Sequence, residues 1–173
     1  MAGKKSLLGY VGEWKLSKGK PGVCPEKFEI SSSGKNKIKV KNIRKYAVGE
    51  VQFDLNKTLV NSSSKKMDKD KDPDGLIQKT YTLKTVVNSS IENGILVSSH
   101  LWSSPDFGYL STGLKTLSLT SGTLKLDKVV TGFMPDKDRD SVSASLRKKY
   151  FSYPNNYSIN SASFSCEFLK MKK

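Results

Sequence analysis

Hydrophobic and polar residues alternate along most of the chain, which is the pattern of strands with one buried face. Phe28 and Ile30 alternate with polar residues, and Ile38 and Val40 do the same after a turn over 32–36. The same period of two recurs over 48–55, 76–87, 95–103, 114–120, 123–130 and 161–170. No segment has the period of an amphipathic helix. Eight or nine short strands in consecutive hairpins predict an all-β fold, a single antiparallel up-and-down barrel.

Polar segments between the strands predict turns and loops. Gly and Pro are frequent in 18–25, and 61–75 is so polar and charged that we expect an exposed loop there. A further strand is expected over 142–146 and a loop over 150–157. The length fits one domain, residues 1–173, in which we expect residues 1–7 to be disordered or an addition to the natural sequence.

The first expected strand, 8–16, carries Gly12 two residues before Trp14. This Gly-x-Trp motif at the start of a long β-chain resembles the lipocalins and the wider calycin superfamily, including small bacterial lipocalin-like proteins. The resemblance covers the whole chain as an architecture, whereas its motif covers only this strand. It implies that Trp14 closes one end of the barrel beneath a basic side chain from near the last strand, for which Arg147 is the first candidate and Lys170 the second. It also implies a protein that holds a small ligand inside the barrel.

Side chains that project into such a barrel are the candidates for contacting a ligand. We expect a small apolar or amphipathic molecule, because ligand pockets are mostly apolar with a few polar groups. Tyr81, His100 and Trp102 would supply those polar groups. The candidate ligand-binding residues are Phe53, Tyr81, Leu83, His100, Trp102 and Leu117. The alternative is that the same side chains simply fill the barrel.

The charge of the chain supports a second interpretation. Thirty Lys and Arg against sixteen Asp and Glu give a net charge of +14, which attracts polyanions. The protein would then bind anionic glycan, nucleic acid or membrane headgroups on its surface, with a filled barrel as scaffold. No aromatic motif typical of RNA-binding or cold-shock domains is present, so nucleic acid is the least expected of these partners. Lysines that alternate with apolar residues, as over 37–41, also serve to keep sheet edges from aggregating.

One loop has the composition of a calcium site. Asp70, Asp72 and Asp74 alternate and are followed by Gly75, as in an EF-hand-like loop. Tyr81 stands where that loop would need a bidentate Glu. The loop therefore either binds Ca²⁺ weakly or is a solvated turn, and no other cofactor is expected.

Enzymatic chemistry finds little support. His100 is the only histidine, so sites built from several histidines are excluded. No nucleophile motif, phosphate-binding loop or dinucleotide fingerprint accompanies it. We therefore expect a protein that is not an enzyme.

Cys24 and Cys166 lie near opposite ends of the chain, where the first and last strands would meet in a closed barrel. They form either a disulfide, which needs an oxidising compartment, or two buried thiols. No apolar run approaches the ~20 residues of a membrane span. No signal peptide is recognised before the first strand. We expect a secreted or periplasmic protein whose export segment has been removed, and the alternative is a cytosolic protein.

Overall fold

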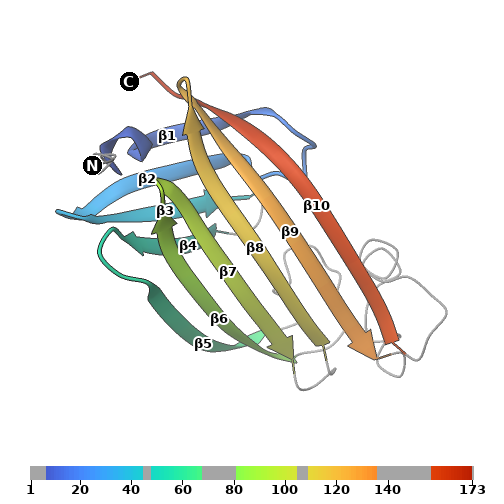
Figure 1. Cartoon of the computed structure of the whole chain (residues 1–173). Coiled ribbons are helices and arrows are strands. Elements are labelled where there is room, and N and C mark those ends of the chain that lie inside the picture. The colour runs from blue at the N-terminus through green and yellow to red at the C-terminus, as the bar shows by residue number, and fades with distance from the viewer. Residues whose placement is uncertain (1–6, 45–47, 68–80, 105–108, 136–156, 173) are drawn as a thin grey trace.

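The chain forms one ten-stranded antiparallel sheet that curls into a nearly closed barrel (Figure 1). The structure is a computed structural model and describes residues 7–44, 48–67, 81–104, 109–135 and 157–172. In chain order the elements are the 3₁₀ turn η1 (Leu7–Tyr10), β1 (Gly12–Lys18), β2 (Lys27–Gly34), β3 (Lys37–Ile43), β4 (Val48–Asp54), β5 (Leu59–Met67), β6 (Tyr81–Glu92), β7 (Ile95–Ser104), β8 (Tyr109–Thr120), β9 (Thr123–Pro135) and β10 (Tyr157–Lys170). Strands pair in the order β4-β3-β2-β1-β10-β9-β8-β7-β6-β5. The predicted all-β, up-and-down barrel is confirmed, with more strands than expected.

Several strands differ from the sequence prediction. Strand β6 ends five residues after the predicted 87, β8 begins five residues before the predicted 114, and β9 ends five residues after the predicted 130. Residues 61–67, which we predicted to be a loop, belong to β5 and pair with β6 from Leu59 opposite Ser89 to Met67 opposite Tyr81. Residues 61–66 are all exposed, so this edge strand has no hydrophobic period and is held by its backbone hydrogen bonds. In addition, β10 begins four residues before the predicted 161. The strand predicted over 142–146 lies outside the described residues.

The sheet closes through its two edge strands, β4 and β5, which lie at opposite ends of the strand order. Across this seam the Ser89 hydroxyl of β6 donates a hydrogen bond of 2.6 Å to the carbonyl oxygen of Gln52 in β4. No continuous strand ladder joins β4 to β5 in the described part of the chain. The barrel is therefore closed everywhere except at this seam, which is bridged by side chains.

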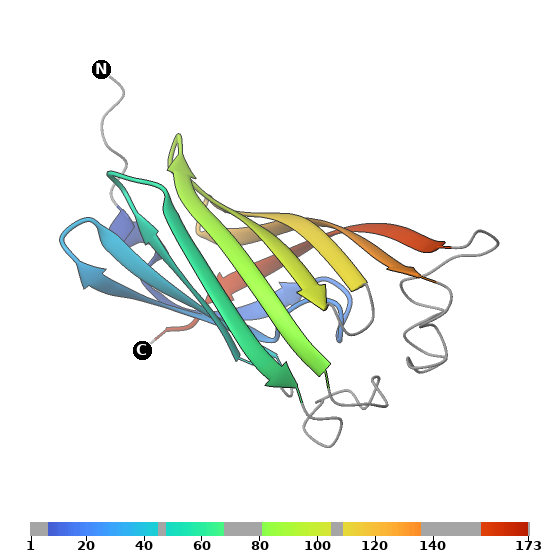
Figure 2. The ribbon, with the colours of Figure 1, turned by 90° about the horizontal axis from the view of Figure 1, so that it is seen from below.

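The strands have unequal lengths, and this shapes the barrel. Strands β1–β4 have seven or eight residues, whereas β6–β10 have ten to fourteen. The long strands continue to the lower right of Figure 1, beyond the short strands (Figure 1, Figure 2). We call the end with η1 and both described termini the closed end, and the end to which β5 and the long strands continue beyond β1–β4 the open end.

Side chains from η1 and β1 plug the closed end. Trp14, only 2% exposed, donates from Nε1 to the carbonyl oxygen of Tyr10 at 2.8 Å. The Tyr10 hydroxyl lies 2.6 Å from the Gly94 oxygen and 3.1 Å from the Leu117 oxygen, and burial raises the pKa of Tyr10 to about 12. Leu7 is buried in the same plug, which corrects our expectation that residue 7 lies outside the fold.

A basic side chain covers Trp14 from the outside. The Lys170 ammonium lies 5.4 Å from the centre of the Trp14 ring, within the range of a cation–π interaction. Its aliphatic carbons pass across Gly12, where any added side chain would collide with them. Of the two basic residues that the lipocalin resemblance suggested for this position, Lys170 is found there, and Arg147 lies outside the described residues.

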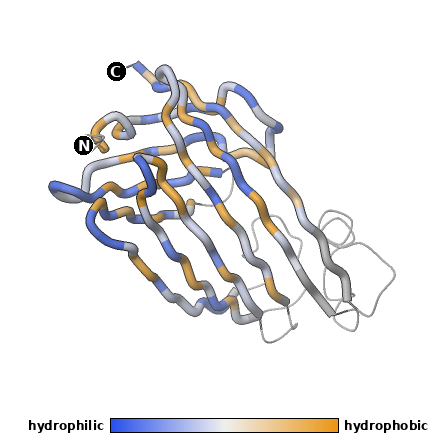
Figure 3. The backbone as a smooth tube through the Cα atoms, viewed as in Figure 1, coloured by the Kyte–Doolittle hydropathy of each residue, from blue (hydrophilic) through white to orange (hydrophobic). Residues whose placement is uncertain are grey.

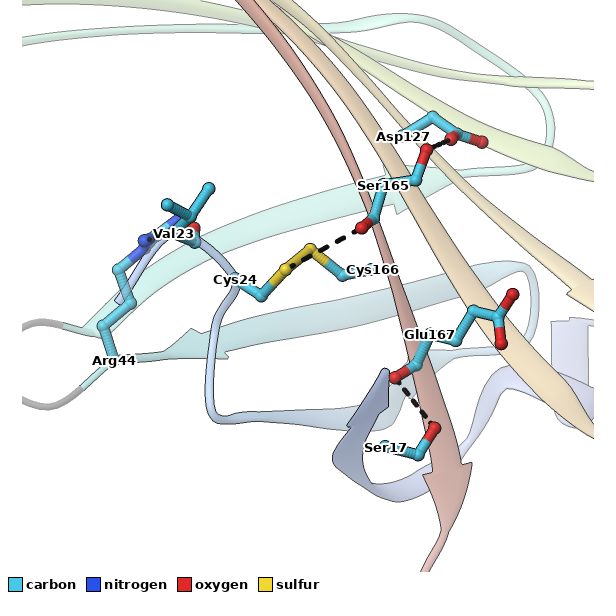
Figure 4. Close-up of a disulfide and its surroundings, with 8 residues drawn as sticks. All are labelled: Ser17, Val23, Cys24, Arg44, Asp127, Ser165, Cys166 and Glu167. Carbon is cyan, nitrogen blue, oxygen red and sulfur yellow. Dashed lines mark hydrogen bonds between the residues drawn. A yellow bond between two sulfur atoms is a disulfide. The ribbon is translucent and has the colours of Figure 1, made fainter. Parts of the chain in front are cut away.

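A disulfide joins Cys24, in the segment between β1 and β2, to Cys166 in β10 (Figure 4). Its sulfur atoms are held in a tight environment, because a side chain at Gly19 would collide with Cys24 Sγ. Nearby, the Ser17 hydroxyl donates to the Glu167 oxygen at 3.0 Å. The two ends of the chain are thus linked both covalently and through the β1–β10 ladder.

Removing this disulfide should destabilise the fold without changing it. The two cysteines are 142 residues apart, so the bond removes much of the entropy of the unfolded chain. We expect Cys24→Ala with Cys166→Ala to lower the free energy of unfolding by about 3–5 kcal/mol in urea denaturation. Reductant should shift the wild-type midpoint and leave that of the double variant unchanged. Equal midpoints for wild type and variant would contradict this role.

Candidate ligand-binding site

The inner face of β6–β10 changes in composition from the closed end to the open end. Inward residues in register across neighbouring strands form rows, and the first row is entirely apolar. This row consists of Ile91, Leu96, Leu117, Leu126 and Cys166. The second row consists of Ser89, Ser98, Lys115, Lys128 and Phe164, and the third of Val87, His100, Gly113, Val130 and Ala162. The alternation that builds these rows is visible along the long strands in Figure 3. The first row belongs to the core, and Phe164 of the second row packs against it. The other side chains of the second row are polar or cationic, so the interior gains polar and charged groups partway along the barrel.

A cleft of about 480 Å³ lies on the inner side of the seam. Its walls come from β4, β5 and β6 and include Val51, Leu59, Asn61, Thr85 and Val87. In the sheet, Val87 is opposite His100, and Thr85 is opposite Trp102. The cleft therefore borders the second and third rows, and its volume is within the range of small-molecule sites.

His100 and Trp102 form one wall of this region. Their rings are stacked, with centres 4.1 Å apart and planes inclined by 27°. The imidazole lies across Gly113 of β8, where an added side chain would occupy the position of the ring. Burial, with repulsion from Lys128 and Lys115, lowers the pKa of His100 to about 4. The ring is thus neutral at physiological pH, and within the described residues its Nε2 is buried without a hydrogen-bond partner.

Lys115 and Lys128 face each other from neighbouring strands on the inner face. Burial lowers the pKa of both ammonium groups to about 8, with repulsion from Arg44 acting on both and repulsion from Lys115 acting on Lys128. Arg44 follows β3 and donates from Nη1 to the Val23 oxygen at 3.0 Å (Figure 4). The charge of Arg44 is therefore close enough to act on both interior lysines.

Aromatic rings hold one of these lysines in place. The Lys128 ammonium lies 5.7 Å from the centre of the Trp102 ring and 6.0 Å from that of Phe164. Such cation–π contacts are strongest where water is excluded. They compensate only part of the loss of hydration, since the Lys128 pKa is still lowered.

No carboxylate pairs with the two interior lysines within the described ranges of the chain. The ion pairs found there involve outward-facing lysines, namely Lys27, Lys37, Lys39 and Lys125. Asp127, on the outer face of β9 beside Lys128, pairs with Lys125 and accepts a hydrogen bond from Ser165. The charges of Lys115 and Lys128 are therefore not balanced by a carboxylate of the described part of the protein.

The residues selected from the sequence fall into three groups. His100 and Trp102 line the polar region, with Leu83 on the same inner face of β6. Phe53 and Leu117, each 1% exposed, are part of the packed core and fill the barrel rather than line a site. Tyr81 begins β6, and its side chain is outside the description. Asp70, Asp72 and Asp74 lie outside the described residues.

Sequence reasoning missed Lys115, Lys128 and Arg44. The signal was present, because the alternation that points Leu117 inward also points Lys115 inward, and Leu126 does the same for Lys128. We treated lysines in strands as outward-facing because charged side chains are rarely buried unpaired. Arg44 approaches them only through the closure of the barrel, which no local pattern encodes.

No protein-family model matches the chain, and a search of curated proteins finds no similar sequence. Among the described residues, no three His, Cys, Asp or Glu side chains are arranged to hold a metal ion. No helix long and apolar enough to cross a membrane occurs in the same part of the chain.

Gly113→Ala should displace the His100 ring and disrupt its stack on Trp102. The new methyl group would occupy the place of the imidazole, which must rotate away. We expect a change in Trp102 fluorescence, measured against the Trp102→Phe background, with the fold retained in circular dichroism. Gly49→Ala is the matched control, because an added side chain at Gly49 meets only ordinary contacts. Identical spectra for Gly113→Ala and wild type would contradict the observed packing.

The interior lysines should make the protein more stable as pH rises. Their folded pKa values of about 8 lie below the usual 10.5, so between these values the unfolded chain holds protons that the folded chain has released. Raising the pH therefore favours the folded state. We expect the free energy of unfolding to increase from about pH 7.5 to about pH 9.5, and to increase less in Lys115→Met with Lys128→Met. Lys125→Met is the outward control and should behave as wild type. Equal pH dependence in both lysine variants would be inconsistent with burial of the pair.

Proposed function

We propose that this protein is a non-catalytic, lipocalin-like barrel that binds a small amphipathic molecule in its interior. The observation that carries the proposal is the change of the inner face from an apolar core to a polar, aromatic and cationic region beside a cleft of about 480 Å³. A barrel that served only as scaffold would gain stability by filling this region with apolar side chains. The chain instead keeps charges there that are expensive to bury.

The closed end supports the lipocalin-like assignment. Gly12, Trp14 and Lys170 form a compact unit in which the basic side chain crosses the glycine and covers the indole. This agrees with what the sequence resemblance implied for the first and last strands. The disulfide between Cys24 and Cys166 favours an oxidising compartment, and we propose a secreted or periplasmic location on that basis.

The electrostatics of the interior favour binding over catalysis. A general base works best with a pKa near the operating pH, whereas burial and the two lysines lower the pKa of His100 to about 4. The hydroxyl groups of Ser104 and Ser111 on the same inner face are buried and lack hydrogen-bond partners within the described residues. These polar atoms are suited to contacting a ligand.

Blocking the cleft should abolish binding of an apolar probe. Val87 points into the cleft, so Val87→Phe should weaken binding of the neutral dye N-phenylnaphthylamine at least about tenfold, a change of ~1.4 kcal/mol. Val86→Phe is the matched control, because Val86 lies on the outer face of the same strand opposite Leu101. Binding is measured by dye fluorescence and by energy transfer from Trp102, which Trp102→Phe removes. No saturable binding to the wild-type protein, or equal loss in both variants, would refute an interior site.

A second candidate function is binding of anionic polymers on the outer surface. The net charge of +14 and the outward-facing lysines of β3, such as Lys39, favour it. Such binding would weaken steeply with salt, because each contact releases counterions. Retention of anionic glycan by the protein at high salt, or its absence at low salt, would argue against this alternative.

A further inference from the structure

The interior charge is concentrated on two lysines in direct register. Lys115 in β8 lies opposite Lys128 in β9, and both side chains are on the inner face. Like charges directly opposite each other in a sheet are destabilising, and burial adds the loss of hydration. Moving either lysine by one residue would place it on the outer face in water. The arrangement is thus a specific feature of this strand pair, and it opposes folding of the empty protein.

The groups that face this pair from other elements do not neutralise it. His100 and Ser98 face it from β7, Phe164 faces it from β10, and Arg44 acts on it from the end of β3. Phe164 and Ser98 carry no charge, and His100 remains neutral above about pH 4. Arg44 adds further positive potential. A buried positive potential of this kind is stabilised by an anion that enters the site.

We propose that Lys115 and Lys128 hold the acidic group of the ligand between them, so that the barrel takes an anionic amphiphile bearing a carboxylate, sulfonate or phosphate ester. This inference rests on the proposed binding function and adds the headgroup chemistry. Two ammonium groups on adjacent strands present several donors to one anion, as charge-assisted hydrogen bonds require.

The surroundings of the pair also indicate where the rest of the ligand lies. Trp102 and Phe164 flank the Lys128 ammonium, and the stacked His100–Trp102 rings offer a flat wall. Thr85 and Val87 continue this wall into the cleft at the seam. An acidic group at the lysines thus leaves the apolar or aromatic body of the ligand against the rings and in the cleft.

A pair of dyes that share one aromatic body separates the headgroup from the body. Anilinonaphthalenesulfonate carries a sulfonate that N-phenylnaphthylamine lacks. We expect the wild-type protein to bind the sulfonate more tightly, and Lys115→Met or Lys128→Met to weaken sulfonate binding about tenfold or more, with neutral-dye affinity changed less than about twofold. Lys128→Arg keeps the charge and should retain sulfonate binding. Lys125→Met, on the outer face of the same strand, should behave as wild type.

The outcomes separate the two proposals. If neither dye binds the wild-type protein, the proposed function fails. If the neutral dye binds but the methionine variants keep their sulfonate affinity, or lose affinity for both dyes equally, the headgroup assignment fails and the interior site stands. The methionine variants are expected to fold, because both lysines are partly buried and replacing a charged side chain there relieves its loss of hydration.

A second measurement uses the unmodified protein. The two lysines lose their charge as pH rises past about 8, so sulfonate affinity should fall between about pH 7 and about pH 10 while neutral-dye affinity stays constant. Binding of the sulfonate should be accompanied by proton uptake near pH 8, seen as a dependence of the calorimetric heat on the buffer. A sulfonate affinity that does not change with pH would overturn the assignment.

Discussion

Pairing of the first strand with the last is the interaction on which the structure depends. Strands β1 and β10 are antiparallel neighbours. Their pairing joins the group β1–β4 to the group β5–β10 in the strand order. Without this ladder the chain would be two separate sheets, each with an exposed apolar face. The disulfide from Cys24 to Cys166 and the Trp14–Lys170 contact both lie along the same junction. The covalent link, the core and the hydrogen bonds therefore stabilise one closure.

Closure of the barrel also determines where function can reside. The short strands β1–β4 face the long strands toward the closed end, where apolar side chains from both halves pack together. The ring centres of Phe28 and Phe168, for example, are 4.8 Å apart. Beyond that level the inner face of β6 borders the cleft that it shares with Val51 of β4 and with β5. Polar and charged side chains cost less free energy there, because they are not surrounded by the core on every side and keep part of their hydration. The mismatch in strand length therefore separates an apolar closed end from the region with polar and charged inner side chains, where we propose that the ligand binds.

Much of the fold could be predicted from the sequence, because alternation with period two is a local property. Phe28, Ile38, Leu117 and Leu126 follow it strictly, and their strands were found, although β8 and β9 are each five residues longer than predicted. Strand β5 could not be found this way, since its exposed Ser and Lys side chains contain no burial signal and its position depends on pairing with β6. The site was predicted only in part. His100 and Trp102 follow the alternation, whereas Arg44 enters through the long-range closure that no single strand reveals.

For the two interior lysines, the residue type and the position in the alternation predict opposite locations. Charge assigns Lys115 and Lys128 to the surface, but the register set by their apolar neighbours assigns them to the interior. The register decides the outcome. Moving β8 by one residue would expose Leu117, and moving β9 would expose Leu124 and Leu126, each of which is at most 1% exposed. The loss of hydrophobic burial would cost ~1.5–3 kcal/mol for each side chain. The partial burial of the two lysines is thus imposed by the apolar residues that precede or follow them on the same face of their strands. The ammonium groups are thus positioned and partly dehydrated before any ligand enters. A ligand of the kind we propose could bind them without further rearrangement, as a preorganised binding site requires.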